Sequence, residues 1–517
     1  MKKEVIRFFN TNKRKFYLGL ILVFGSFLRL YHLEYTLPVD PDAAMALLIA
    51  KKIVEENYVL LVGPLTSLSN FNILPPTYYY IISVLYFFFR NYLAIAYCFA
   101  IIGIISIYLI YKVGLILIGP KGALTAALVF SASHYMVRHA RAVWEPHLVP
   151  FFILLAIYFL LLYEKQGKFL LFIISVSAFF VSLMYISSFL LIPGYFMLSF
   201  YVLSKKFQNK LLVLSALAVI FSVFFLMIYL PTIIYEINNN YPTWNNLKNY
   251  FRGNTIYFKP DFSLIISQIY KNSVLSFDLL KLFPNLLSVV FLFIYLVMHF
   301  LLTKRAILPP KIKYMLLLFL PGFFMTGFYQ GQPAIHRLNA LSLIIIILYA
   351  GIGGINRLNL KKYRLFSAIS VFLLLGIYGQ FLFFTIGEMK NIPWEKISYK
   401  DRSVFQTAEY ILAKAGQSSF SISTSTPGEP KNYHTTRYIY ALEKISGKNL
   451  SKMNKKGNWL SSRVQKNKDY IFLICQNYNA ANVSTECLKY FLNMEKLPLF
   501  LSEKQIGRNI IYQIPGI

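Results

Sequence analysis

The chain has 517 residues, of which 57% are apolar, 17% aromatic and only 14% charged. Because soluble domains carry about 25% charged residues, this composition excludes a soluble enzyme, a disordered chain and a disulfide scaffold, and predicts an α-helical polytopic membrane protein. The formal net charge is +31, but the basic residues cluster in short loops between apolar runs, which favours membrane topology and anionic lipid headgroups over a nucleic-acid partner.

The first apolar run, 16–33, follows a basic N-terminus and has no small-residue cleavage site, so we expect a signal anchor whose N-terminus is cytoplasmic. A spanning helix needs about 17–25 apolar residues. Further runs that meet or approach this length bring the predicted total to eleven spans: 92–113, 121–137, 148–163, 168–185, 187–203, 210–230, 283–303, 313–328, 337–354 and 364–385.

The apolar stretch 77–89 is short for a span, because it begins after Pro75-Pro76 and stops at Arg90. If it crossed the membrane, the basic loops after it would face outward, against the positive-inside rule. We therefore expect this stretch to lie in the outer interface, where its tyrosines suit the headgroup level. The C-terminus is then outside, as are the segments 34–91, 138–147, 231–282 and 387–517.

The tail differs in composition from the rest, which predicts a transmembrane module over 1–386 and a small extracytoplasmic mixed α/β domain over 387–517. Cys475 and Cys487 both lie in this domain. They could pair in an oxidising compartment, but two free buried thiols fit the sequence equally well. The expected strands are Phe420–Ser423, Tyr470–Cys475 and Ile510–Ile514, and the expected helices are Val404–Ala415 and Thr435–Ile445.

Acidic residues are scarce in the membrane half, and one pair follows the first span. Asp40 is placed to cap a helix that begins at Pro41, which leaves Asp42 in the first turn, where the helix dipole favours an anion. Capping accounts fully for Asp40. For Asp42 the same geometry is compatible with a functional carboxylate at the membrane surface.

Two further polar clusters fall at predicted outer ends of spans. The loop 138–147 contains Arg138, Arg141, two histidines, Trp144 and Glu145, and His336-Arg337 precedes a late span. Basic residues are uncommon in short outer loops, and arginine suits phosphate because its planar fork bonds two oxygens. Headgroup snorkelling is the alternative explanation. Together the clusters suit a substrate with a membrane-embedded tail and a phosphate.

With these clusters the chain resembles the C-type integral-membrane glycosyltransferases that use polyprenyl-phosphate sugars, in the branch of protein O-mannosyltransferases and the lipid A aminoarabinose transferase. The resemblance covers roughly residues 15–355 and the architecture of the tail. It is carried by the order and topological placement of four elements: Arg29 to Asp42, Pro75 to Tyr80, Arg138 to Pro146, and His336-Arg337.

The resemblance implies an inverting transfer of a hexosyl or pentosyl group from a polyprenyl-phosphate donor to an envelope lipid, glycan or protein. It implies a multi-pass protein of the plasma membrane, with Asp42 as general base, acting outside the cytoplasm. A divalent cation, Mg²⁺ or Mn²⁺, could be held by Asp42 and Glu145. The resemblance assigns donor-phosphate binding to Arg138, Arg141, His336 and Arg337, and substrate binding to Tyr78, Tyr79 and Trp144.

The sequence departs from the family pattern at Ala43, where the family has Glu, at Leu74, where some members have Lys, and at Glu145, where relatives often have Asp or Asn. Other classes remain open. A polysaccharide ligase or polymerase shares the donor chemistry. A transporter or flippase of lipid-linked sugars predicts mid-membrane charges and repeats, which the sequence lacks. A non-enzymatic scaffold fits the wide outer loops poorly.

Overall fold

The structure is a computed structural model, and it describes residues 2–37, 40–64, 74–251, 262–278, 311, 313–328, 338–353, 399–425, 435–447, 469–476, 487, 502–506 and 509–515. The chain divides into two compact units. We call the first, Met1–Tyr31, Leu61–Tyr78 and Ala96–Asn391, the helical unit. We call the second, His32–Leu60, Tyr79–Ile95 and Ile392–Ile517, the mixed unit.

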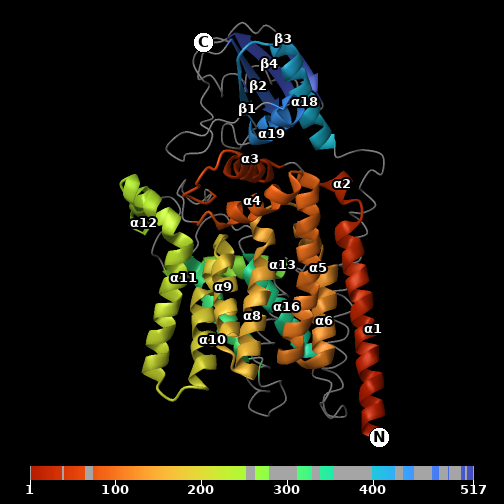
Figure 1. Ribbon diagram of the computed structural model, residues 1–517, viewed down its shortest axis with the longest axis vertical. Coiled ribbons are helices and arrows are strands. Elements are labelled where there is room, and N and C mark those ends of the chain that lie inside the picture. Colours follow the sequence, from red (N-terminus) through yellow and green to blue (C-terminus); the bar gives the residue numbers. More distant parts are fainter. Residues whose placement is uncertain are drawn as a thin grey trace. The chain divides into compact units, whose positions relative to one another are not determined.

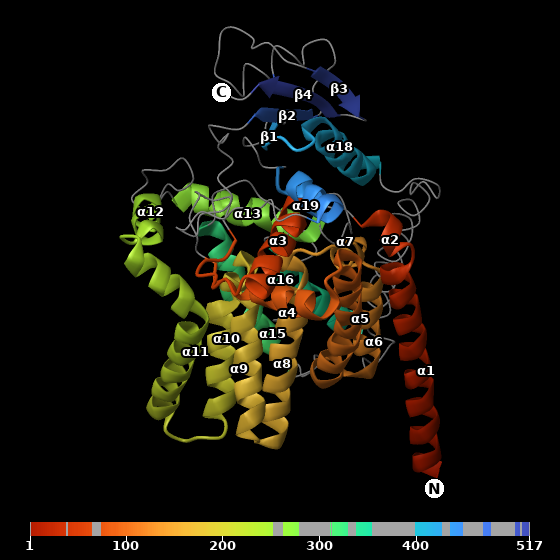
Figure 2. The same cartoon turned by 45° about the horizontal axis from the view of Figure 1, so that its top comes forward.

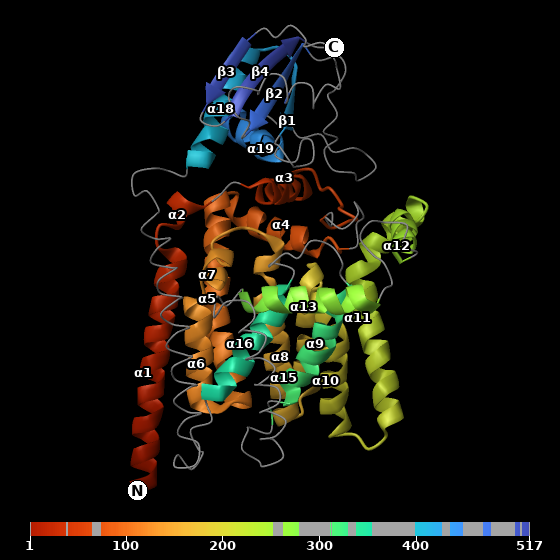
Figure 3. The same ribbon diagram turned by 180° about the vertical axis from the view of Figure 1, so that it is seen from behind.

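The helical unit is built mainly from apolar helices, which pair backbone N–H and C=O groups within the same segment, as lipid requires. Figures 1 and 3 show α8 to α11 side by side, and α15 packs against α10 while α16 packs against α6. Its elements are α1 (Lys2–Leu30), α5 (Tyr92–Leu117), α6 (Gly119–Ala132), α7 (His134–His139), η1 (Glu145–His147), α8 (Val149–Gln166), α9 (Phe169–Ser182), η2 (Ile186–Leu191), α10 (Ile192–Ser204), α11 (Lys210–Asn238), α12 (Pro242–Phe251), α13 (Phe262–Asp278), α15 (Lys313–Met325), η3 (Thr326–Phe328) and α16 (Asn339–Gly353).

Four of the described helical segments are long and apolar enough to cross a membrane: Tyr92–Leu117, Glu145–Gln166, Ile186–Ser204 and Lys210–Asn238. They coincide with four of the predicted runs. The runs 283–303 and 364–385 lie outside the described residues. The structure thus supports a helical membrane protein, and the total of eleven spans stays a prediction.

The predicted run 121–137 is not one helix. α6 ends at Ala132, and α7 begins at His134. Ser133 joins them: its backbone N–H donates to the Val129 oxygen at 2.9 Å, and its side chain accepts from the Met136 amide. A residue that ends one helix and caps the next turns the chain within an apolar run, a change that hydrophobicity alone does not reveal.

The mixed unit combines two parts of the first outer segment, on either side of Leu61–Tyr78, with the C-terminal domain. Its sheet has the order β1-β2-β4-β3, with β1 parallel to β2 and the other pairs antiparallel. Its elements are α2 (Leu33–Thr36), α3 (Pro41–Glu55), α4 (Thr77–Phe89, which begins in the helical unit), α18 (Tyr399–Ala415), β1 (Phe420–Ser425), α19 (Thr435–Ser446), β2 (Tyr470–Gln476), β3 (Ser502–Ile506) and β4 (Asn509–Pro515).

The sheet's core follows the period of two expected of a strand. Phe472 and Ile474 of β2 pack with Leu442 of α19 and with α18, while Ile471 and Leu473 face the other side. The predicted strands and helices of this domain are all present. β3 was missed, because an exposed edge strand of sequence SEKQI carries no apolar alternation.

Cys475 and Cys487 form a disulfide, which settles the choice that the sequence left open. The bond ties the end of β2 to residue 487, and both cysteines are buried in the cluster around Ile471 and Tyr512.

Candidate functional site

Asp42 lies where the sequence predicts it, in the first turn of α3. The Asp40 carboxylate accepts a hydrogen bond from the Ala43 amide at 2.9 Å, and Pro41 occupies the first helical position. The capping prediction is therefore confirmed. Asp40 is committed to holding the helix start, which leaves Asp42 as the carboxylate of the pair that is available for chemistry.

The Asp42 side chain is half-buried, and no hydrogen bond or ion pair reaches it from the residues that the structure describes. Burial, helped by the negative charge of Asp40, raises the pKa of Asp42 to about 7. A general base works best when its pKa lies near the operating pH. This carboxylate therefore has the properties of a proton acceptor at neutral pH.

Tyr78 and Tyr79, which were assigned to the substrate, are packed side chains, 1% and 4% exposed. The neighbouring Tyr80 donates its hydroxyl hydrogen to the Leu60 oxygen at 2.8 Å, which ties α4 to the chain just after α3. Substrate binding by Tyr78 and Tyr79 stays a prediction. The exposed apolar side chains of α4 are Val84 and Phe87–Phe89, in its second half, where they suit the lipid interface.

In the loop 138–147 the two predicted phosphate ligands differ. Arg138 is exposed at the end of α7. Arg141 is half-buried, and its Nη1 donates to the backbone oxygens of Leu28, at 2.9 Å, and Arg29, at 3.3 Å. Burial lowers the pKa of Arg141 to about 10, so it keeps its charge at neutral pH. Arg141 therefore holds the loop to the end of α1.

Arg29 supports the end of α6, a role that was not predicted from the sequence. Its guanidinium is fully buried and donates to the backbone oxygens of Gly25, at 3.1 Å, Ser131, at 3.0 Å, and Phe130, at 3.2 Å. The last two are carbonyls at the end of α6, where the helix dipole favours a cation. The sequence signal that could have predicted this role is a lone arginine in the last turn of an apolar helix.

The aromatic side chains of the loop pack on one another. The His139 ring lies 3.8 Å from that of Tyr135 and 4.2 Å from that of His147, and Trp144 lies 5.5 Å from His147. His147 Nδ1 is 2.6 Å from the Ala142 oxygen. Trp144 remains half-buried, so one ring of the cluster keeps surface that a sugar could use.

The structure does not test every residue of the predicted site. His336 and Arg337 lie outside the described residues. Asp42 belongs to the mixed unit and Glu145, which is buried at the start of η1, to the helical unit. No group of three or more His, Cys, Asp or Glu side chains suited to a metal occurs within the described ranges. These residues alone do not supply the ligand set of an ion, so we derive no step through a metal.

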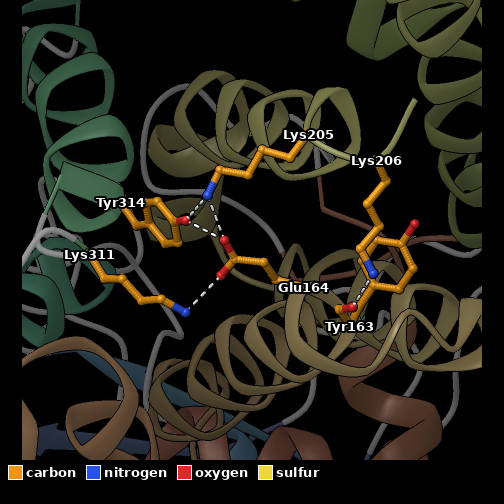
Figure 4. A network of polar contacts seen from close by, with 6 residues as sticks. All are labelled: Tyr163, Glu164, Lys205, Lys206, Lys311 and Tyr314. Atoms are coloured by element: carbon orange, nitrogen blue, oxygen red, sulfur yellow. Dashed lines mark hydrogen bonds and ion pairs between the residues drawn. The ribbon is translucent and has the colours of Figure 1, made fainter. Parts of the chain in front are cut away.

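A second acidic site was not predicted. Glu164, near the end of α8, accepts from Lys205 at 2.6 Å and from Lys311 at 3.0 Å, and the Tyr314 hydroxyl donates to it at 2.5 Å (Figure 4). Lys206 beside it donates to the Tyr163 oxygen at 2.8 Å. The network connects the end of α8 to residues after α10 and at the start of α15. Its role is therefore structural: it holds these helix ends together.

No protein-family model matches the sequence, and no curated protein sequence matches it. Among solved structures, ArnT from Cupriavidus metallidurans bound to undecaprenyl phosphate is 12% identical over 97% of this chain and 98% of that one, with a TM-score of 0.59. Its apo form is 13% identical over 98% of both chains, with a TM-score of 0.60. The Archaeoglobus fulgidus oligosaccharyltransferase aligns with 84% of this chain and 64% of its own, at a TM-score of 0.48.

The chain therefore has the fold of the C-type membrane glycosyltransferases. This confirms, at the level of fold, the resemblance that the sequence motifs indicate. ArnT from Cupriavidus metallidurans is a structure with this fold that aligns over nearly the whole chain.

Proposed function

We propose that this protein is a membrane glycosyltransferase that moves a sugar from a polyprenyl-phosphate donor to an envelope acceptor, with inversion at the anomeric carbon. The observation that carries the proposal is Asp42, an outer-segment carboxylate that no described residue pairs and whose pKa is raised to about 7. The fold shared with ArnT, whose structure contains undecaprenyl phosphate, supports the donor class.

In the proposed reaction Asp42 accepts the proton of an acceptor hydroxyl while the hydroxyl oxygen bonds to the anomeric carbon. The bond from this carbon to the phosphate oxygen breaks, and polyprenyl phosphate leaves with the electron pair. A single displacement inverts the anomeric configuration. Asp42 gains one proton, which it returns to solvent before the next turnover.

Arg138 is the described residue that best suits the leaving phosphate, because its guanidinium is exposed and can offer a bidentate contact. Arg141 would act beside it while holding the loop in place, and His336 and Arg337 complete the proposed phosphate site. Trp144 would stack on the sugar. We assign no role in the step to a cation, although Asp42 and Glu145 remain the proposed ligands should one bind.

We place the reaction on the extracytoplasmic side of the plasma membrane, in a multi-pass protein with a cytoplasmic N-terminus. The disulfide between Cys475 and Cys487 supports this orientation, because disulfides persist in oxidising compartments. The acceptor would be a lipid, glycan or protein of the envelope, and the transferred group a hexose or pentose.

The test uses the purified protein in lipid with a radiolabelled undecaprenyl-phosphate sugar and native membrane extract as the acceptor source. Wild type should release undecaprenyl phosphate, and Asp42→Asn should not. The matched control is Asp40→Asn, which removes a carboxylate two positions away but should retain turnover with a cost in stability of about 1 kcal/mol or less, because Asn also caps helices well. Full activity of Asp42→Asn would refute the role of Asp42 as general base. Movement of the donor across the bilayer without release of undecaprenyl phosphate would favour a transporter.

A further inference from the structure

Within the mixed unit, α3 is packed against α19, a helix of the C-terminal domain that lies almost four hundred residues further along the chain (Figure 2). The Thr436 hydroxyl donates to the backbone oxygen of Pro41 at 3.1 Å, in a buried environment. Pro41 immediately precedes Asp42. The hydrogen bond therefore acts on the turn of backbone that carries the proposed base.

A charged contact holds α3 further along its length. Lys51 lies 2.8 Å from Glu443, whose side chain is only 4% exposed. The next residue, Lys52, is also buried, and burial lowers its pKa, while the charges of Glu56 and Glu443 oppose this change. A buried carboxylate is costly to leave unpaired, so the Lys51–Glu443 pair fixes the register of α3 on α19.

α19 has a second face that belongs to the sheet. Tyr438 and Leu442 pack in the core between the helices and the strands, and Thr435 hydrogen-bonds Thr424 of β1 at 3.0 Å. Thr436 and Glu443 are separated by seven residues, two helical turns, and so lie on one side of α19. The helix therefore links the sheet of the C-terminal domain mechanically to α3.

We propose that Thr436 and Glu443 are positioning residues for Asp42, so that the C-terminal domain is an integral part of the catalytic site and not a separable acceptor-binding module. The inference rests on the proposed role of Asp42 as base. Its physical basis is that proton transfer requires the carboxylate at hydrogen-bonding distance from the acceptor, and misplacement by about 1 Å can reduce the rate about 100-fold. α19 makes one contact, from Thr436 to Pro41, at the turn that carries Asp42, and a second, from Glu443 to Lys51, further along α3.

The first experiment compares two identical chemical changes in the full-length protein in lipid. Thr436→Val removes the hydrogen bond to α3, and Thr435→Val removes one inside the C-terminal domain. We expect Thr436→Val to lower kcat about tenfold or more, with donor KM unchanged, and to shift the acid limb of the pH–rate profile. Thr435→Val should lower thermal stability without moving this limb. Equal effects of the two variants on kcat and the pH profile would overturn the proposal.

The second experiment is a double-mutant cycle on Lys51 and Glu443, with the exposed Glu409 as control. Glu443→Gln and Lys51→Met should each lower kcat, and the double variant should lose less than the product of the two losses. Glu409→Gln should retain wild-type kcat. Hydrogen exchange of the α3 amides should rise in both single variants, a readout that does not depend on turnover. Independent effects in the cycle, or unchanged exchange, would contradict the inference.

The two proposals fail in different ways. If Asp42→Asn is inactive while Thr436→Val and Glu443→Gln keep wild-type kcat and pH profile, the positioning role is wrong and the proposed function stands. If Asp42→Asn is fully active, Asp42 is not the general base, and the proposal that α19 positions this base fails with it.

Discussion

Glu164 in the helical unit and Asp42 in the mixed unit are both partly shielded carboxylates near helix ends, yet their surroundings are opposite. Glu164 receives two lysine ammonium groups and a tyrosine hydroxyl. Asp42 receives no hydrogen bond or ion pair from the described part of the chain, and its nearest charge effect comes from another carboxylate. The first arrangement stabilises an anion permanently, and the second keeps a carboxylate able to take up a proton.

The comparison shows that the presence of an acidic residue near a membrane surface does not by itself indicate a function. The groups that contact its carboxylate indicate whether its role is structural or functional. Glu164 was not singled out in the sequence, and the basic residues that pair with it were attributed to topology. Its ion pairs account for those residues structurally. Asp42 keeps an unfavourable environment, and such sites in proteins are more often functional than structural.

The largest expected effect sharpens this contrast. Asp42→Asn should lower kcat by about 10²–10⁴-fold, the usual contribution of a general base, without loss of folding. Glu164→Gln should leave kcat near that of wild type. Donor turnover in lipid measures both. A Glu164→Gln variant that is folded but as inactive as Asp42→Asn would remove the distinction between the two carboxylates.

The second prediction concerns pH. Because the pKa of Asp42 is raised to about 7 and a base must be ionised, kcat/KM should increase with pH through about 7 and fall about tenfold per unit below it. A rate profile from pH 5 to 9 measures this limb. A limb near pH 4 would mean that the carboxylate is not held in the observed environment during turnover.

A third, smaller effect concerns folding. Glu164→Gln should destabilise the helical unit by about 1–3 kcal/mol, because Lys205 and Lys311 lose a charged acceptor. Thermal unfolding in detergent measures the loss. Lys165→Gln is the matched control, since this exposed neighbour on α8 should change stability little. Equal unfolding temperatures for the two variants would show that the Glu164 network contributes nothing measurable to stability.

The smallest expected effect is a gain in stability. The pKa of Asp42 is higher in the folded protein than in the unfolded chain, so between about pH 4 and 7 the folded state binds more protons, and stability falls as pH rises. Asp42→Asn should therefore raise Tm by about 2–4 °C at pH 8 and by less at pH 5. A variant that is less stable than wild type at pH 8 would indicate an unrecognised partner of the carboxylate.

Local features were predicted well from the sequence. The cap at Asp40, the helix over 77–89, and the alternating strands of the tail follow from chemistry within a few residues of each position. Prediction failed where a distant partner decides, and where apolar patterning either continues across a helix break or is absent. The break at Ser133, the carbonyls that accept from Arg29 and the edge strand β3 have no signal of comparable strength in their own segments.

The sequence by itself determined the class of the protein, since apolar runs of this length leave few stable alternatives to membrane helices, and it placed a carboxylate in the first turn of α3. Only the tertiary structure decided which carboxylate is paired, which arginine supports the backbone and which helix covers α3. The physical reason is distance along the chain: Arg29 meets Ser131 across 102 positions and Lys51 meets Glu443 across 392, so these contacts depend on packing that no local pattern encodes.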